Sequence, residues 1–121
     1  MFLNLKKTAK DNKISREEVR SICEDAGVRV EKCFNIAARN KASDNHWADV
    51  NPLNFEKPWT FVLVDQYNSK LHVLQIPPRA INPNLFRTKA GKLDINIDPK
   101  TLVDVKNGVD FGKYKVKDLS Y

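Results

Sequence analysis

Residues 59–77 have the sequence WTFVLVDQYNSKLHVLQIP, and the fold is decided in this stretch. Its first part, residues 59–64, is an almost unbroken run of aromatic and β-branched side chains, which is typical of a strand buried on both faces in the middle of a sheet. Turn-forming residues follow at 66–70, and apolar residues return over 71–76 until two prolines end the ladder. The stretch therefore predicts a β-hairpin at the centre of the structure.

The bulk composition is that of a small globular protein. A length of 121 residues predicts one domain, which is large enough to bury roughly two-thirds of its unfolded surface. No apolar run approaches the roughly 20 residues of a membrane span. The first ten residues, MFLNLKKTAK, lack the order of charges and the cleavage site of a secretory signal. We therefore expect an intracellular, cytoplasmic protein with no membrane partner.

The cysteine count argues against a disulfide framework and against a zinc site. Only Cys23 and Cys33 are present, and neither belongs to a CxxC pair or to a matched pair of histidines. We expect two reduced thiols that are buried or half-buried, and neither a metal nor a cofactor.

The positive charge of the chain is clustered. Lys and Arg number 21 against 15 Asp and Glu, which gives a net charge of +6. Residues 1–13 hold four lysines against one aspartate, and residues 59–92 hold five cations against one aspartate. A basic balance concerns the partner of a protein rather than its fold, and it favours a polyanion such as nucleic acid.

The elements before the central hairpin are predicted from periodicity and capping. Residues 1–13 predict a short basic helix or arm. Ser15 as N-cap with Glu18 three residues later predicts a helix from Arg16 to Ala26. An alternating pattern predicts a long half-buried strand over residues 28–38, and residues 40–58, rich in Asn, Asp and Pro, predict a long packed loop across one end of the sheet.

The elements after the hairpin are predicted in the same way. Residues 78–90 are irregular with room for one helical turn, and residues 92–97 alternate as a fourth strand. Asp98 before Pro99, with Asn107–Gly108 at the end, predicts a second helix. In the tail we expect buried and outward side chains to alternate. The buried ones are Phe111, Tyr114, Val116 and Leu119, and the outward ones are Lys113, Lys115 and Lys117. The expected fold is α+β: one mainly antiparallel sheet of about four strands with two principal helices packed on it.

Cations with an aromatic residue among them follow the central hairpin directly. Cations on a loop anchored by a sheet can neutralise phosphates, and an interleaved aromatic side chain can stack on a base. The candidate nucleic-acid-binding residues are Arg79, Phe86, Arg87, Lys89 and Lys92, extended by Lys6, Lys7 and Lys10 if the two basic segments meet. The alternative is a solvated loop with Leu85 and Phe86 in the core.

The predicted loop at 40–58 is a second candidate site, for interaction with another protein. Its candidate residues are Arg39, Lys41, His46 and Trp47. Exposed aromatic side chains in a polar loop are common interface anchors. His46 lies near Asp44 and Asp49 in the sequence, which suits an acid/base pair or one edge of a metal site, although surface turn chemistry explains the same pattern.

The order of the predicted elements from residue 16 to residue 77, helix followed by three strands, resembles the core of the restriction-endonuclease-like nucleases of the PD-(D/E)xK type. The resemblance covers about half of the chain. It implies Mg²⁺ held by carboxylates, for which the nearest residues are Glu17 or Glu18 on the helix, Asp65, and Gln75 in Gln75-Ile76-Pro77. Asp65 lies at the far end of its strand, and proline occupies the place of the motif's lysine.

These observations favour a non-enzymatic nucleic-acid-binding module, for example of a defence or mobile-element system, that contacts phosphates through clustered Lys and Arg. One alternative is a protein-interaction module, an inhibitor or adaptor that docks on a nucleic-acid-handling enzyme. Another is a degenerate or active Mg²⁺-dependent nuclease, the one case that requires a metal.

Overall fold

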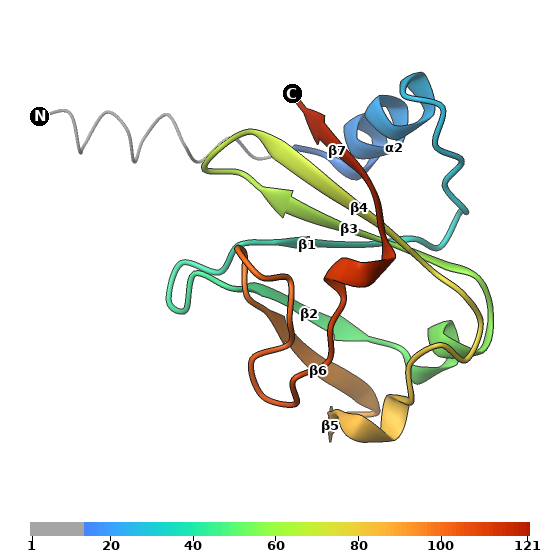
Figure 1. Ribbon diagram of the computed structural model, residues 1–121, viewed down its shortest axis with the longest axis vertical. Helices are drawn as coiled ribbons and strands as arrows, with labels where there is room; N and C mark the ends of the chain where they lie inside the picture. The colour runs from blue at the N-terminus through green and yellow to red at the C-terminus, as the bar shows by residue number, and fades with distance from the viewer. Residues whose placement is uncertain (1–13) are drawn as a thin grey trace, which may run out of the picture.

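Two β-sheets and one α-helix make up residues 14–121, the part of the chain that the computed structural model describes (Figure 1). Helix α2 comes first (Arg16–Asp25). The four-stranded sheet has the order β1 (Asn35–Ala38), β3 (Trp59–Asp65), β4 (Lys70–Ile76), β7 (Lys115–Ser120). The three-stranded sheet has the order β2 (His46–Val50), β6 (Lys92–Ile97), β5 (Arg87–Lys89). Short 3₁₀ turns are η1 (Pro52–Glu56), η2 (Pro83–Leu85) and η3 (Gly112–Tyr114). The predicted helix or arm at 1–13 lies outside the described residues.

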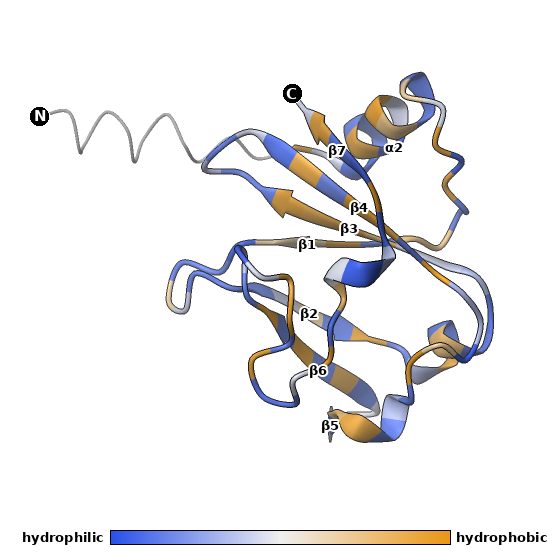
Figure 2. Ribbon diagram, viewed as in Figure 1, coloured by the Kyte–Doolittle hydropathy of each residue, from blue (hydrophilic) through white to orange (hydrophobic). Residues whose placement is uncertain are grey.

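The predicted central hairpin is confirmed. Strands β3 and β4 pair antiparallel from Trp59 opposite Ile76 to Asp65 opposite Lys70, and every residue of β3 is buried. The four-stranded sheet is the middle layer, with α2 on one face and the three-stranded sheet on the other (Figure 1). Val62 packs in the cluster beneath the helix, whereas Phe61 packs in the cluster shared with the three-stranded sheet. Both faces of β3 are therefore apolar, as Figure 2 shows along the strand.

Helix α2 begins and ends as its capping residues predict. The Ser15 hydroxyl accepts a hydrogen bond from the Glu18 amide, and the Glu18 carboxylate accepts one from the Ser15 amide, each over 3.1 Å. Gly27 follows the helix with a φ of +81°, a left-handed conformation that glycine adopts without strain. Val19 and Cys23 are buried against the four-stranded sheet.

The predicted strand at 28–38 is wrong over most of its length. Only residues 35–38 form a strand, β1, and it pairs parallel to β3, so the four-stranded sheet is mixed, with one parallel and two antiparallel pairings. Before β1 the backbone bonds to side chains instead of to a strand. The Arg20 guanidinium donates to the carbonyls of Val30 and Glu31 over 3.3 and 3.4 Å. Because these carbonyls have partners from the helix, the segment stays ordered without a ladder.

The predicted loop at 40–58 is also wrong, because it contains β2 and η1. Along β2, His46, Ala48 and Val50 are buried while Trp47 and Asp49 are exposed, a period of two over five residues. The inward series begins with a histidine, a residue with no strong strand preference, and this hides the pattern.

The second predicted helix does not form, and the structure has one α-helix among the described residues rather than two. The Asp98 carboxylate accepts hydrogen bonds from the amides of Lys100 and Thr101 over 2.7 and 3.0 Å, as a helix N-cap does. One turn later Leu102 has a φ of +58°, so the chain reverses and pairs with β6 instead. Asp104 then repeats the turn and accepts from the amides of Lys106 and Asn107. Two consecutive Asx-capped turns therefore replace the helix.

The tail ends in the edge strand β7, which the sequence did not predict. Phe111 is fully buried, as expected. Val116 is half exposed rather than buried, because the register with β4 shifts between Val73 and Leu74 and leaves it without an opposite residue.

Candidate functional site: the outer face of the three-stranded sheet

The three-stranded sheet buries one face and exposes the other. On β6, Leu93, Ile95 and Ile97 are buried against the four-stranded sheet, so the residues between them point away from it. Directly paired residues of antiparallel strands lie on the same face. We call the exposed side the outer face; it consists of Trp47 and Asp49 on β2, Lys92, Asp94 and Asn96 on β6, Arg87 and Lys89 on β5, and the adjoining Val105 and Lys106.

Three exposed cations lie at the hairpin end of the outer face. Arg87 is opposite Asp94, and Lys89 is opposite Lys92. The two residues of the turn between the strands, Ala90 and Gly91, have φ values of +53° and +79°, as in the tight turns typical of two-residue hairpins. No carboxylate within residues 14–121 forms an ion pair with any of the three cations. Like charges directly opposite each other are unfavourable, so the Lys89–Lys92 pair is better stabilised when an anion lies between them.

An exposed aromatic side chain lies on the same face. Trp47 is 42% exposed, and its indole Nε1 donates to Asp94 Oδ1 over 2.6 Å. The same carboxylate accepts from Lys106 Nζ and from the Asn96 side-chain Nδ2, each over 3.2 Å. Burial works to raise the pKa of Asp94, but the hydrogen bonds from Trp47 and Lys106 outweigh it and hold the pKa below its usual value. An ionised carboxylate therefore fixes the indole in place.

The cations predicted to bind nucleic acid do not all lie together. Arg87, Lys89 and Lys92 come together on the outer face. Arg79 does not join them, because its backbone amide donates to the Phe55 carbonyl and its guanidinium lies 3.4 Å from Glu56. Lys6, Lys7 and Lys10 lie outside the described residues.

Phe86 was the wrong aromatic residue. It is 5% exposed, and its ring centroid lies 5.9 Å from that of Phe55 and 6.0 Å from that of Phe111. A base cannot stack on a side chain that holds the core together. Phe86 lies in the core, as the alternative expects, whereas Leu85 beside it is half exposed and residues 87–89 form strand β5 rather than a loop.

The predicted interaction loop is not one surface. Arg39 is a structural brace: its guanidinium forms ion pairs with Asp44 and Asp65, and its backbone exchanges hydrogen bonds of 2.9 and 2.8 Å with the Gln66 amide. Burial works to raise the pKa of Asp65, but hydrogen bonds from Asn68 and Arg39 keep it below its usual value. Trp47, by contrast, belongs to the outer face. Lys41 is exposed at the turn that follows Arg39.

His46 is a core residue rather than an exposed acid or base. It is fully buried, and its Nδ1 lies 2.9 Å from the Ala37 carbonyl oxygen. A carbonyl only accepts, so Nδ1 carries the hydrogen and Nε2 is the bare nitrogen. This Nε2 is buried without a hydrogen-bond partner in residues 14–121, and the His72 ring lies edge-on with its centroid 6.5 Å away. Burial lowers the pKa of His46 to about 4.

The residues that the nuclease resemblance points to do not converge. Glu18 caps its own helix, and Asp65 accepts hydrogen bonds from Asn68 and Arg39. Gln75 lies opposite Thr60 at the other end of the hairpin, five residues from Asp65 along the register, which corresponds to roughly 17 Å. The described part of the chain contains no group of three or more His, Cys, Asp or Glu side chains suited to a metal ion.

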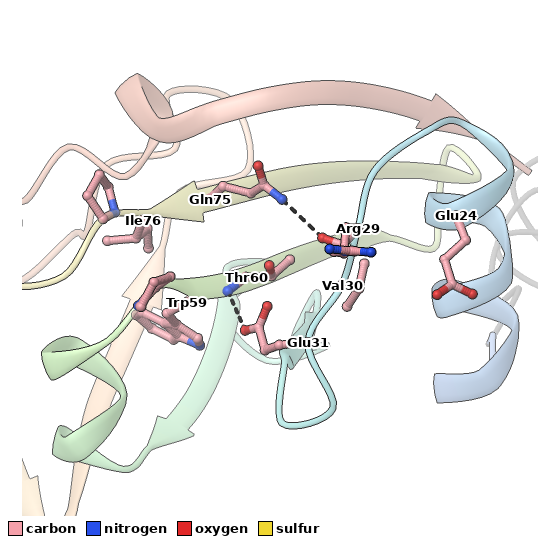
Figure 3. Close-up of a pocket in the computed structure, with 10 residues that line it drawn as sticks. Glu24, Arg29, Val30, Glu31, Trp59, Thr60, Gln75 and Ile76 are labelled. Atoms are coloured by element: carbon pink, nitrogen blue, oxygen red, sulfur yellow. Dashed lines mark hydrogen bonds between the residues drawn. The ribbon is translucent and has the colours of Figure 1, made fainter.

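Gln75 instead lines a cleft of about 590 Å³ between residues 29–31 and the hairpin (Figure 3). The Glu31 carboxylate accepts a hydrogen bond from the Thr60 amide over 2.6 Å, and the Gln75 side chain donates to the Arg29 carbonyl over 3.2 Å. Both polar side chains therefore fasten the irregular segment to the sheet. The Glu31 and Gln75 side chains therefore have a structural role.

The fold and the site define a small α+β protein with an exposed sheet face that carries cations and a tryptophan. No protein-family model, no curated protein and no solved structure matches the chain. In residues 14–121 there is no helix with the length and apolar character needed to cross a membrane.

Proposed function

We propose that this protein binds nucleic acid through the outer face, with Arg87, Lys89 and Lys92 in contact with phosphates. The observation that carries the proposal is the placement of three cations on one face, none of them in an ion pair with a carboxylate of the described residues, with two of the cations directly opposite each other. A phosphate between Lys89 and Lys92 replaces their repulsion with attraction. Phosphate contacts carry no sequence information, so the proposed binding is independent of sequence.

The salt dependence of binding tests this proposal. Three phosphate contacts correspond to a slope of log affinity against log salt of about −2 for a single strand and about −3 for a duplex. We expect a double variant, Arg87→Ala with Lys89→Ala, to weaken binding similarly for all sequences and to remove about two-thirds of the slope. Fluorescence anisotropy of labelled oligonucleotides from 50 to 200 mM salt measures both quantities.

A matched control removes the same charge elsewhere. Lys32 and Lys70 are exposed and lie away from the three-stranded sheet, on the segment after α2 and at the start of β4. The double variant Lys32→Ala with Lys70→Ala should keep the slope of the unchanged protein. Equal loss of affinity in the two double variants would show that total charge rather than the outer face attracts the ligand, and the site assignment would fall.

A protein-binding role is the second candidate, and one observation favours it. Val105 is 50% exposed, and its amide donates to the Asn96 carbonyl, so Val105 and Trp47 flank Asn96 on the outer face. Exposed tryptophan beside an apolar side chain is common at protein interfaces. Absence of nucleic-acid binding together with a partner that co-purifies with the unchanged chain but not with a Trp47→Ala variant would favour this role.

A further inference from the structure

We infer that the ligand of the outer face is a single-stranded nucleic acid, with an unpaired base stacked on Trp47 and the phosphates that follow it placed along Arg87, Lys89 and Lys92. This inference rests on the proposed function and names its substrate class. It depends on the distance between the indole and the cations and on the shape of the surface that carries them.

The register fixes the spacing along the outer face. Trp47 is opposite Asn96, Arg87 is opposite Asp94, and Lys89 is opposite Lys92. At about 3.4 Å per residue along the strands, the tryptophan row lies roughly 7 Å from the Arg87 row and roughly 14 Å from the lysine row. Arg87 and Lys89 are also displaced sideways from Trp47 by two strand spacings of about 4.8 Å each, because β6 lies between β2 and β5. Phosphates of one strand are ~3.4 Å apart along the axis of a stacked helix and further apart in an extended strand, so the face spans about two to four nucleotides. A base and the phosphates that follow it can therefore contact the tryptophan and the cations together.

The shape of the face favours an unpaired strand over a duplex. In a duplex each base is already stacked between its neighbours, so an aromatic side chain gains little unless the base is unpaired. Groove readers insert a helix or a two-stranded ribbon. Here α2, the one α-helix of residues 14–121, lies on the far side of the four-stranded sheet (Figure 1), and β5 and β6 are part of a three-stranded sheet rather than a separate two-stranded ribbon. What the outer face presents is an open antiparallel surface, which suits stacking.

Two aspartates determine where the nucleic-acid strand lies on the outer face. Asp94 holds the Trp47 indole, so the stacking surface is ordered before binding and less side-chain entropy is lost. Asp49 lies opposite Asp94 on β2, is exposed, and forms no ion pair with another residue of the described range. The Asp49 carboxylate repels phosphates. The sugar-phosphate backbone of the nucleic acid is therefore placed on the β5 side of the outer face, over Arg87 and Lys89, rather than over β2.

The test is a fluorescence titration with oligonucleotides of two, four and eight thymidines or uridines and with a blunt duplex of eight base pairs. Trp47 is exposed whereas Trp59 is 2% exposed, so quenching on binding reports on Trp47. We expect single strands to quench the fluorescence and to bind more tightly than the duplex, with affinity rising to four nucleotides and little beyond. Trp47→Ala and Trp47→Phe lack the reporting indole, so their affinities are measured by fluorescence anisotropy of labelled oligonucleotides. Trp47→Ala should weaken binding about 5- to 150-fold, and Trp47→Phe should restore part of it. Asp49→Asn should tighten binding a few-fold.

The outcomes separate the inference from the proposed function. If duplex and single strand bind equally and Trp47→Ala binds as the unchanged protein does, while Arg87→Ala with Lys89→Ala weakens both, the stacking inference is overturned and the proposed function stands. If no oligonucleotide binds at 50 mM salt, both are overturned. Thermal unfolding of each variant shows whether it is folded, and the rescue by Trp47→Phe distinguishes loss of stacking from loss of structure.

Discussion

Acidification should destabilise this protein well above the pH at which carboxylates titrate, because of His46. Its imidazole is fully buried between the sheets and has a pKa of about 4, against 6.5 for a free histidine. The unfolded chain therefore takes up a proton at this position before the folded chain does. The free energy of unfolding is largest above pH 6.5, falls as the pH drops from 6.5 to 4, and loses nothing more from this group below about pH 4.

The magnitude follows from the difference in pKa. Each pKa unit corresponds to 1.36 kcal/mol, so the shift of about 2.5 units amounts to roughly 3 kcal/mol of stability. This is a substantial part of the 5–15 kcal/mol typical of a domain. The assay is urea denaturation at half-unit steps from pH 7.5 to pH 4.5, followed through the fluorescence of the buried Trp59.

The informative variant is His46→Phe, which keeps an aromatic ring in the core and removes the titrating group. The free energy of unfolding of this variant is subtracted from that of the unchanged protein, and the contribution of the carboxylates then cancels. The difference should fall by up to 1.36 kcal/mol per pH unit as the pH is lowered. His72→Gln is the control and should retain most of the pH dependence, because His46 remains. If the His46→Phe variant and the unchanged protein lose stability in parallel between pH 6.5 and pH 5, the assignment to His46 is wrong.

Three further predictions concern single positions. Ala90→Asn should stabilise the protein by about 0.5–1 kcal/mol in thermal denaturation, because asparagine is favoured at a positive φ before glycine in a tight hairpin turn; a loss of stability would contradict the turn geometry. Asp65→Asn should lower the free energy of unfolding by about 2–3 kcal/mol, since the largely buried Arg39 guanidinium loses one of its two ion pairs; a neutral effect in urea denaturation would contradict this. A thiol reagent should modify one cysteine per folded molecule and two in urea, because Cys33 is exposed and Cys23 is fully buried; two fast thiols in the native state would contradict the packing of α2.

The sequence predicted those elements whose signals are local. The capping box at Ser15 and the hairpin at 59–77 each carry their own turn or cap, and both form where expected. The parallel pairing of β1 with β3 depends on contacts between distant segments, and nothing within residues 35–38 distinguishes a parallel from an antiparallel neighbour. The sequence pattern therefore could not predict that the sheet is mixed.

The false second helix shows how an N-cap signal can mislead. An aspartate that accepts hydrogen bonds from the next amides starts a helix and an Asx turn in the same way. What distinguishes them is the following turn, where the buried Leu102 adopts a positive φ and its carbonyl accepts from Phe111 and Gly112. The same arrangement recurs at Asp104, six residues later. The spacing of the two aspartates in the sequence was the signal that indicated a repeated turn.

The candidate site was predicted in part for a related reason. Closeness along the chain suggested Phe86 as the aromatic partner of Arg87, but Phe86 lies between η2 and β5 and is buried in the core, whereas Arg87 is exposed. The aromatic residue that shares a face with Arg87 comes from β2, because β6 pairs with β2 on one side and with β5 on the other. The cation on β5 and the aromatic residue on β2 therefore share a face although they are far apart in the sequence. The alternation of apolar and polar residues in 48–50 was the one sequence signal that places Trp47 on that face.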